Sequence, residues 1–143
     1  MRCLLPTLIL TALPALALAE TTLIDVSALP SKQVYDVADL TPLALTPEGA
    51  PAVVLLDLKA GDVVPPHAAK SGLRLLTVLS GDMSWGDGSA IDEAREKIYP
   101  AGSILTVPAG LDHWLAARAG DVRLQLVVLD DEKPVPALKE QMQ

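Results

Sequence analysis

The sequence has 143 residues, of which 50% are hydrophobic, and its formal net charge is −7. A chain of this length fits one ordinary domain, and an acidic chain repels a phosphate backbone, which argues against a nucleic-acid partner. Only 3% of the residues are aromatic and Phe is absent, so a hydrophobic core must be built mainly from aliphatic side chains.

Residues 1–19 have the organisation of a secretory signal peptide. Arg2 precedes an apolar run that closes on a small-x-small pattern at residues 17–19, directly before Glu20. A retained membrane anchor is the alternative, but two prolines interrupt the run and it is short for spanning a bilayer. The sequence therefore predicts a periplasmic or secreted protein, residues 20–143, with no membrane partner after cleavage. Its only cysteine lies in the removed segment, so no disulfide is expected.

Beyond residue 20, short apolar runs alternate with Pro, Gly and Asp, and no helical period persists over three turns. Residues 20–50 are expected to form an N-terminal wrapping arm, with an edge strand at 34–37 and a turn at Thr41-Pro42. Strands are expected in seven later segments: residues 53–58, 73–79, 83–85, 90–99, 103–107, 113–117 and 122–129. Such a series predicts an all-β sandwich or small barrel.

Two stretches contain motifs with defined spacing. Residues 61–81 follow G-x5-H-x-H-x4-E-x6-G except at two positions, and residues 102–113 follow G-x5-P-x-G-x2-H-x3-N at every position up to the histidine. These are the motifs of the cupin superfamily, and the chain resembles small secreted single-domain cupins over about residues 50–130. The resemblance implies one jelly-roll β-barrel domain.

The resemblance also implies a place for a metal ion, because cupins bind divalent ions through the His, His, Glu and His of these motifs. The corresponding positions here hold His67, Ala69, Arg74 and His113. Two imidazoles are an incomplete ligand set for a catalytic metal, and the guanidinium of Arg74 would put a fixed cation where the family has a coordinating anion. The sequence therefore predicts a degenerate metal site with no cofactor, and a divalent metal is disfavoured.

Strand alternation predicts which side chains share the interior with these positions. If Arg74 has the orientation of the family's Glu, Leu76 points inward with it, and Leu115 points inward with His113. The result is an apolar pocket in which His67, Arg74 and His113 are convergent hydrogen-bond donors. Guanidinium pairs bidentately with carboxylate or phosphate, and either imidazole can donate a further bond. The expected ligand is a small anionic molecule.

Structural roles are the alternative for each of these residues. Both histidines can be remnants of a lost metal site, and Arg74 can pair with a carboxylate such as Asp62 or Asp112 and plug a disused cavity. Trp85 is expected to cover the sheet at a hairpin, and Trp114 is expected to pack in the core or in a dimer interface.

Three classes of function follow from this sequence. The favoured one is a metal-independent protein that binds an anionic metabolite through the three pocket residues. The second is an enzyme, either a metal-dependent cupin of oxygenase or isomerase type with incomplete motif ligands, or a metal-free isomerase or lyase with a histidine as general base. The third is a dimeric structural or assembly module that pairs through Leu75, Thr77 and Leu79. A homodimer is compatible with all three, no catalytic residue is assigned, and enzyme activity stays open.

Overall fold

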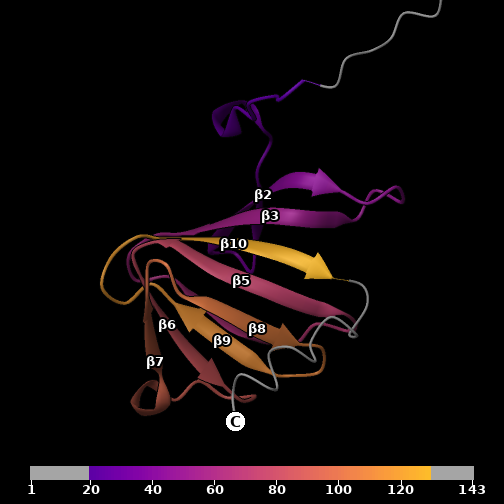
Figure 1. Ribbon diagram of the computed structural model, residues 1–143. Coiled ribbons are helices and arrows are strands. Elements are labelled where there is room, and N and C mark those ends of the chain that lie inside the picture. The colour runs from indigo at the N-terminus through magenta and orange to yellow at the C-terminus, as the bar shows by residue number, and fades with distance from the viewer. Residues whose placement is uncertain (1–19, 130–143) are drawn as a thin grey trace, which may run out of the picture.

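Two antiparallel sheets face each other in residues 20–129, the part of the chain that this computed structural model describes (Figure 1). One sheet has six strands in the order β1-β2-β3-β10-β5-β8, and the other has four in the order β4-β9-β6-β7. The strands are β1 (Lys32–Val34), β2 (Ala38–Leu45), β3 (Pro51–Leu58), β4 (Val63–His67), β5 (Leu73–Ser80), β6 (Asp82–Asp87), β7 (Lys97–Pro100), β8 (Ile104–Pro108), β9 (His113–Ala116) and β10 (Val122–Leu129), and the two 3-10 helices are η1 (Val26–Ala28) and η2 (Glu93–Arg95).

The predicted signal peptide and the tail from residue 130 lie outside the described residues. Within residues 20–129, no helix is long and apolar enough to cross a membrane.

The strands after residue 50 lie where the sequence predicts them, with two differences. Residues 90–96 do not form a strand, because Asp92 caps η2 by accepting from the backbone N–H of Ala94, and β7 begins only at Lys97. The first motif also contributes β4, which was not predicted as a strand because Pro65 and Pro66 interrupt it. An edge strand tolerates proline, and β4 is at the edge of its sheet.

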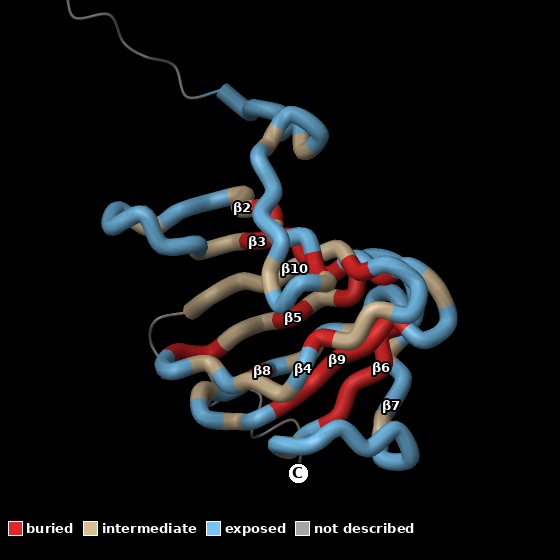
Figure 2. The backbone as a smooth tube through the Cα atoms, turned by 180° about the vertical axis from the view of Figure 1, so that it is seen from behind, coloured by how far each residue is buried: buried red, intermediate tan, exposed pale blue. Residues whose placement is uncertain are grey.

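The segment expected to be a wrapping arm instead extends the larger sheet. Its β1–β2 hairpin pairs with β3, and only residues 20–31 lie apart from the sheets, exposed along most of their length (Figure 2). The predicted edge strand at residues 34–37 is wrong, because these residues form the turn between β1 and β2. The predicted turn at Thr41-Pro42 is also wrong. Both residues lie inside β2, where a register shift after Pro42 accommodates the proline.

The core between the sheets is mainly aliphatic, as the composition predicts. Buried side chains run along β6 and β9 and along the centre of β5 (Figure 2). Leu76 and Val78 of β5 and Leu115 of β9 all belong to one buried cluster, which confirms the predicted alternation on these strands. The same cluster contains Trp85, so this indole, expected to cover the sheet at a hairpin, does so on the inner face and also lines the cavity.

Trp114 packs on the outer face of the four-stranded sheet, beneath the loop that joins β6 to β7. It is only 1% exposed, and its Nε1 donates to Oε1 of Glu96 at 2.9 Å. Arg118 donates through Nη2 and Nε to the two oxygens of the same carboxylate at 2.7 and 3.1 Å, which lowers the pKa of Glu96. The indole is therefore covered by its own chain, and the loop is held against the barrel.

Gly86, which pairs with Trp114 across the strands, has no room for a side chain. A Cβ at this position would collide with the indole ring, so we expect Gly86→Ala to lower the free energy of unfolding by about 1–3 kcal/mol. Urea titration of both proteins measures the loss. Gly120→Ala is the control, because a Cβ there meets nothing within 4 Å. A comparable loss in both variants would contradict this account.

Candidate functional site

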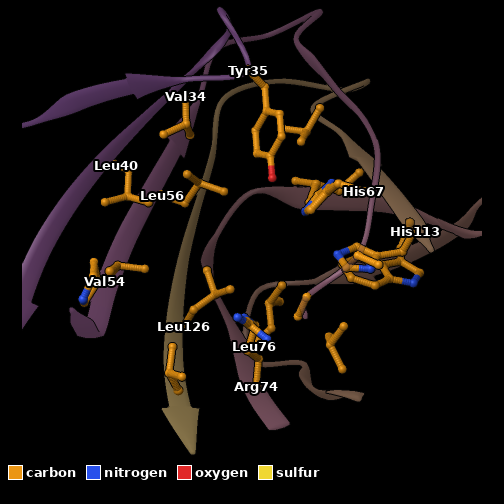
Figure 3. A pocket seen from close by; sticks show the side chains of 18 of the residues that line it. Val34, Tyr35, Leu40, Val54, Leu56, His67, Arg74, Leu76, His113 and Leu126 are labelled. Carbon is orange, nitrogen blue, oxygen red and sulfur yellow. The ribbon is translucent and has the colours of Figure 1, made fainter. Parts of the chain in front are cut away.

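A cavity of about 650 Å³ lies inside the barrel. His67 of β4, Arg74 of β5 and His113 of β9 all line it, so the structure brings the three predicted pocket residues to one space (Figure 3). Much of the remaining wall is aliphatic: Val34, Leu40, Val54, Leu56, Val64, Leu76, Val107, Leu115, Leu126 and Val128. The cavity is thus an apolar container with a few polar groups that can orient a ligand.

His67 reaches this cavity through a bulge in β4. Val64 pairs with Leu115 and His67 pairs with His113, so β4 has one more residue than β9 between the two pairs. With strict alternation from the buried Val64, His67 would point outward. The additional residue reverses the phase and turns His67 inward.

Hydrogen bonds to the backbone determine which nitrogen of each imidazole carries the proton. Nδ1 of His67 lies 2.9 Å from the carbonyl oxygen of Pro65, and Nδ1 of His113 lies 2.9 Å from that of Leu111. A carbonyl oxygen only accepts, so each Nδ1 carries a proton and donates it. Nε2 of the neutral ring is therefore an acceptor. We predicted from the sequence that the imidazoles donate to the ligand. Nε2 can donate only after the ring has taken up a second proton.

Four aromatic rings form a column along one side of the cavity. The ring centroids of Tyr35 and His67 are 4.7 Å apart, those of His67 and His113 are 4.4 Å apart, and those of His113 and Trp85 are 4.4 Å apart. Trp85 is 5% exposed, its plane is 11° from that of His113, and its Nε1 donates to Asp87 at 2.8 Å. Because each ring packs on the next, the column holds the two imidazoles in place.

The surroundings of His113 favour its neutral form. The residue is 5% exposed, and burial holds its pKa below the usual value of 6.5. The carbonyl of Leu111 and the charge of Asp87 oppose this pKa shift, while His67 and Arg74 reinforce it. At neutral pH the ring is therefore an uncharged acceptor at Nε2.

Arg74 brings a permanent positive charge to the cavity wall. The side chain is half-buried, and its Nη1 donates to the carbonyl oxygen of Ser71 at 3.2 Å. No carboxylate within residues 20–129 forms an ion pair with it. Asp62, one partner considered from the sequence, instead accepts from the backbone N–H of Lys59 at 2.8 Å. The described residues therefore contain no acid that plugs the cavity.

Lys32 adds a second cation to the wall, and no Asp or Glu is among the described residues that line the cavity. The sequence analysis did not identify Lys32, because it lies in β1, far along the chain from both motifs. The chain as a whole has a net charge of −7, so the positive charge at the cavity results from the way the fold brings Arg74 and Lys32 together.

Tyr35 is another cavity residue that the sequence analysis missed. It lies in the turn of residues 35–37 between β1 and β2, where φ is 54° at Tyr35 and 59° at Asp36, and Val37 N–H donates to Val34 O at 3.3 Å. This is a type I′ turn, and the left-handed conformation costs a residue with a side chain about 1–2 kcal/mol. The apolar residues around this turn resemble strand alternation, so no sequence signal marked it.

The side chains around the cavity do not fit a catalytic divalent metal ion. Nε2 of His67 and Nε2 of His113 can ligate, but Ala69 has no ligating atom and Arg74 is a cation, although both line the same space. Within residues 20–129, no group of three or more His, Cys, Asp or Glu is placed to hold a metal. Two neutral nitrogens beside a fixed positive charge are too few donors for such an ion.

Neither a protein-family model nor a curated protein matches this sequence, but solved structures resemble its fold. A predicted oxalate decarboxylase from Thermotoga maritima has a TM-score of 0.62 at 15% identity, over 77% of this chain and 100% of that one. The polyketide cyclase RemF from Streptomyces resistomycificus has a TM-score of 0.62 at 18% identity, with 80% and 83% covered. An RmlC-like cupin from Shewanella frigidimarina has a TM-score of 0.58 at 14% identity, with 81% and 96% covered.

Identities this low establish the fold alone. The two facing antiparallel sheets agree with these likenesses and with the two sequence motifs, and together they show that this protein has the cupin fold.

Proposed function

We propose that this protein binds a small anionic metabolite in its barrel without a metal ion, and that it does so in the periplasm or outside the cell. The observation that carries the proposal is the charge of the cavity. Arg74 and Lys32 line it, and no described lining residue is acidic, in a chain whose net charge is −7. A half-buried guanidinium that has no carboxylate partner within residues 20–129 favours an anion, which it can pair bidentately. The proposed location rests on residues 1–19.

The other cavity groups define what else the ligand needs. When the rings are neutral, Nε2 of His67 and Nε2 of His113 are hydrogen-bond acceptors, so they suit a hydroxyl or N–H group of the ligand and do not suit a second anionic group. The aliphatic wall suits a hydrocarbon body. A carboxylate or phosphate ester with an apolar part and a hydrogen-bond donor for each Nε2 satisfies all of these groups.

An enzyme is the second candidate, and one observation favours it. The buried Nε2 of His113 is a free acceptor with a lowered pKa, which is the state that a general base needs. Asp87 pairs with His113 across the strands, but it accepts a hydrogen bond from Trp85 and is not among the lining residues. Because no Asp or Glu lines the cavity among the described residues, we favour binding over turnover.

Anion binding predicts a thermal shift that depends on Arg74. Sodium benzoate or phosphate should raise the melting temperature of the wild-type protein relative to sodium chloride at equal ionic strength, because a ligand that binds only the folded state stabilises it. At a concentration 100 times Kd the gain is about 2.7 kcal/mol. Arg74→Gln should lose the shift. Arg95→Gln, which removes an exposed arginine of η2, should keep it. Equal shifts in both variants would place the anion elsewhere.

The lowered pKa of His113 predicts acid destabilisation. Below pH 6.5 the unfolded chain takes up a proton at this residue that the folded chain resists, so the free energy of unfolding falls as the pH is lowered. His113→Gln keeps a polar side chain but does not titrate. Urea titrations at pH 7.5 and pH 5 should therefore show a smaller loss for His113→Gln than for the wild type. Identical losses would show that His113 titrates normally.

If this protein binds no metal because two cupin ligands are missing, supplying those ligands should create metal binding. Ala69 and Arg74 line the cavity together with His67 and His113, so the double variant Ala69→His with Arg74→Glu supplies the four cupin ligand types. We expect this variant, but not the wild type, to retain about one zinc or manganese ion per chain after dialysis, as measured by elemental analysis. Stoichiometric metal in the purified wild-type protein would overturn the proposal.

A further inference from the structure

The β1–β2 turn holds Tyr35 at the cavity in a backbone conformation that tyrosine does not favour. Both central residues of the turn have positive φ, and the pair that a type I′ turn prefers is Asn-Gly, whereas this chain has Tyr35-Asp36. The hairpin itself gains little from the aromatic ring. Val34 and Val37 pack against the core cluster, while Tyr35 does not belong to it and is 48% exposed. Strain of this kind persists where a side chain has a function.

The ring of Tyr35 and that of His67 together place two polar atoms at the same part of the cavity. The ring centroids are 4.7 Å apart, and Figure 3 shows the phenol oxygen pointing into the cavity. Burial raises the pKa of Tyr35, so its hydroxyl is protonated at neutral pH and can both donate and accept. Nε2 of His67 can accept, because Nδ1 is bonded to the backbone. Arg74 lies on the opposite side of the cavity in the same view.

We propose that Tyr35 contacts the ligand and determines its specificity, forming with His67 a polar subsite for a hydroxyl group. The ligand class is then the hydroxycarboxylates, with the carboxylate at Arg74. This inference rests on the proposed function, because it requires an anion at Arg74. A hydroxyl group suits the subsite since it can donate to Nε2 of His67 and accept from the phenol. A second carboxylate would face the acceptor nitrogen, and a cationic group would be repelled by Arg74 and Lys32.

Benzoate and its three monohydroxy isomers test the subsite by titration calorimetry, at a temperature below the melting point of every protein used. The wild type should bind at least one isomer about tenfold tighter than benzoate, which corresponds to about 1.4 kcal/mol. Tyr35→Phe, which removes only the hydroxyl, should reduce this ratio to about threefold or less, and Tyr35→Asn should abolish it. Asp36→Gly changes the same turn but keeps the ring, so it should retain the wild-type ratio.

The melting temperature of the Tyr35→Asn variant distinguishes a role of Tyr35 in ligand binding from a role in supporting the hairpin. Asparagine tolerates the left-handed conformation, so Tyr35→Asn should leave the melting temperature unchanged or raise it while the isomer preference is lost. A lower melting temperature with the preference intact would show that the ring only supports the hairpin. The inference is also overturned if no isomer binds tighter than benzoate, or if the preference survives in both Tyr35 variants.

The two proposals can fail separately. If benzoate binds the wild type and requires Arg74, but the hydroxyl group makes no difference, only the subsite at Tyr35 is refuted. If neither benzoate nor any isomer binds, the proposed function fails and the subsite fails with it.

Discussion

A permanent positive charge inside an apolar barrel is the constraint on which the chemistry of this protein depends. Arg74 is half-buried, cannot lose its proton, and has no carboxylate partner among the described residues. Water and the carbonyl oxygen of Ser71 can satisfy its hydrogen bonds, but neither neutralises its charge. The proposed anionic ligand would neutralise this charge, and the second cation, Lys32, acts in the same direction. This charge also makes the two histidines poor ligands for a divalent metal ion.

Backbone hydrogen bonds give those histidines a defined chemical state. Because Pro65 and Leu111 accept from Nδ1, both Nε2 atoms are acceptors while the rings are neutral. The same arrangement would present Nε2 to a metal ion if the ligand set were complete. Stacking on Trp85 keeps His113 in place without a metal.

The strained turn and the strands that carry the histidines belong to different sheets and meet at the cavity. Trp114, Glu96 and Arg118 are joined by hydrogen bonds on the outer side of the four-stranded sheet. The strands of the same sheet, β4 and β9, carry the two histidines. The β1–β2 hairpin lies at the edge of the other sheet and carries the strained Tyr35. Among the described residues, positive φ at residues with a side chain is thus confined to this turn at the cavity.

The sequence by itself determined the all-β class, most strands after residue 50, and the three pocket residues, because apolar alternation and motif spacing are local properties of the chain. The N-terminal hairpin was mispredicted, since Tyr35-Asp36 carries no glycine to mark a turn and Pro42 is tolerated inside a strand only through a register shift. The resemblance to cupins placed His67 in the pocket, but only the tertiary structure shows the bulge that turns it inward, and only the tertiary structure brings Lys32 and Tyr35 to the cavity. These outcomes depend on pairing between segments distant in sequence, which no local pattern encodes.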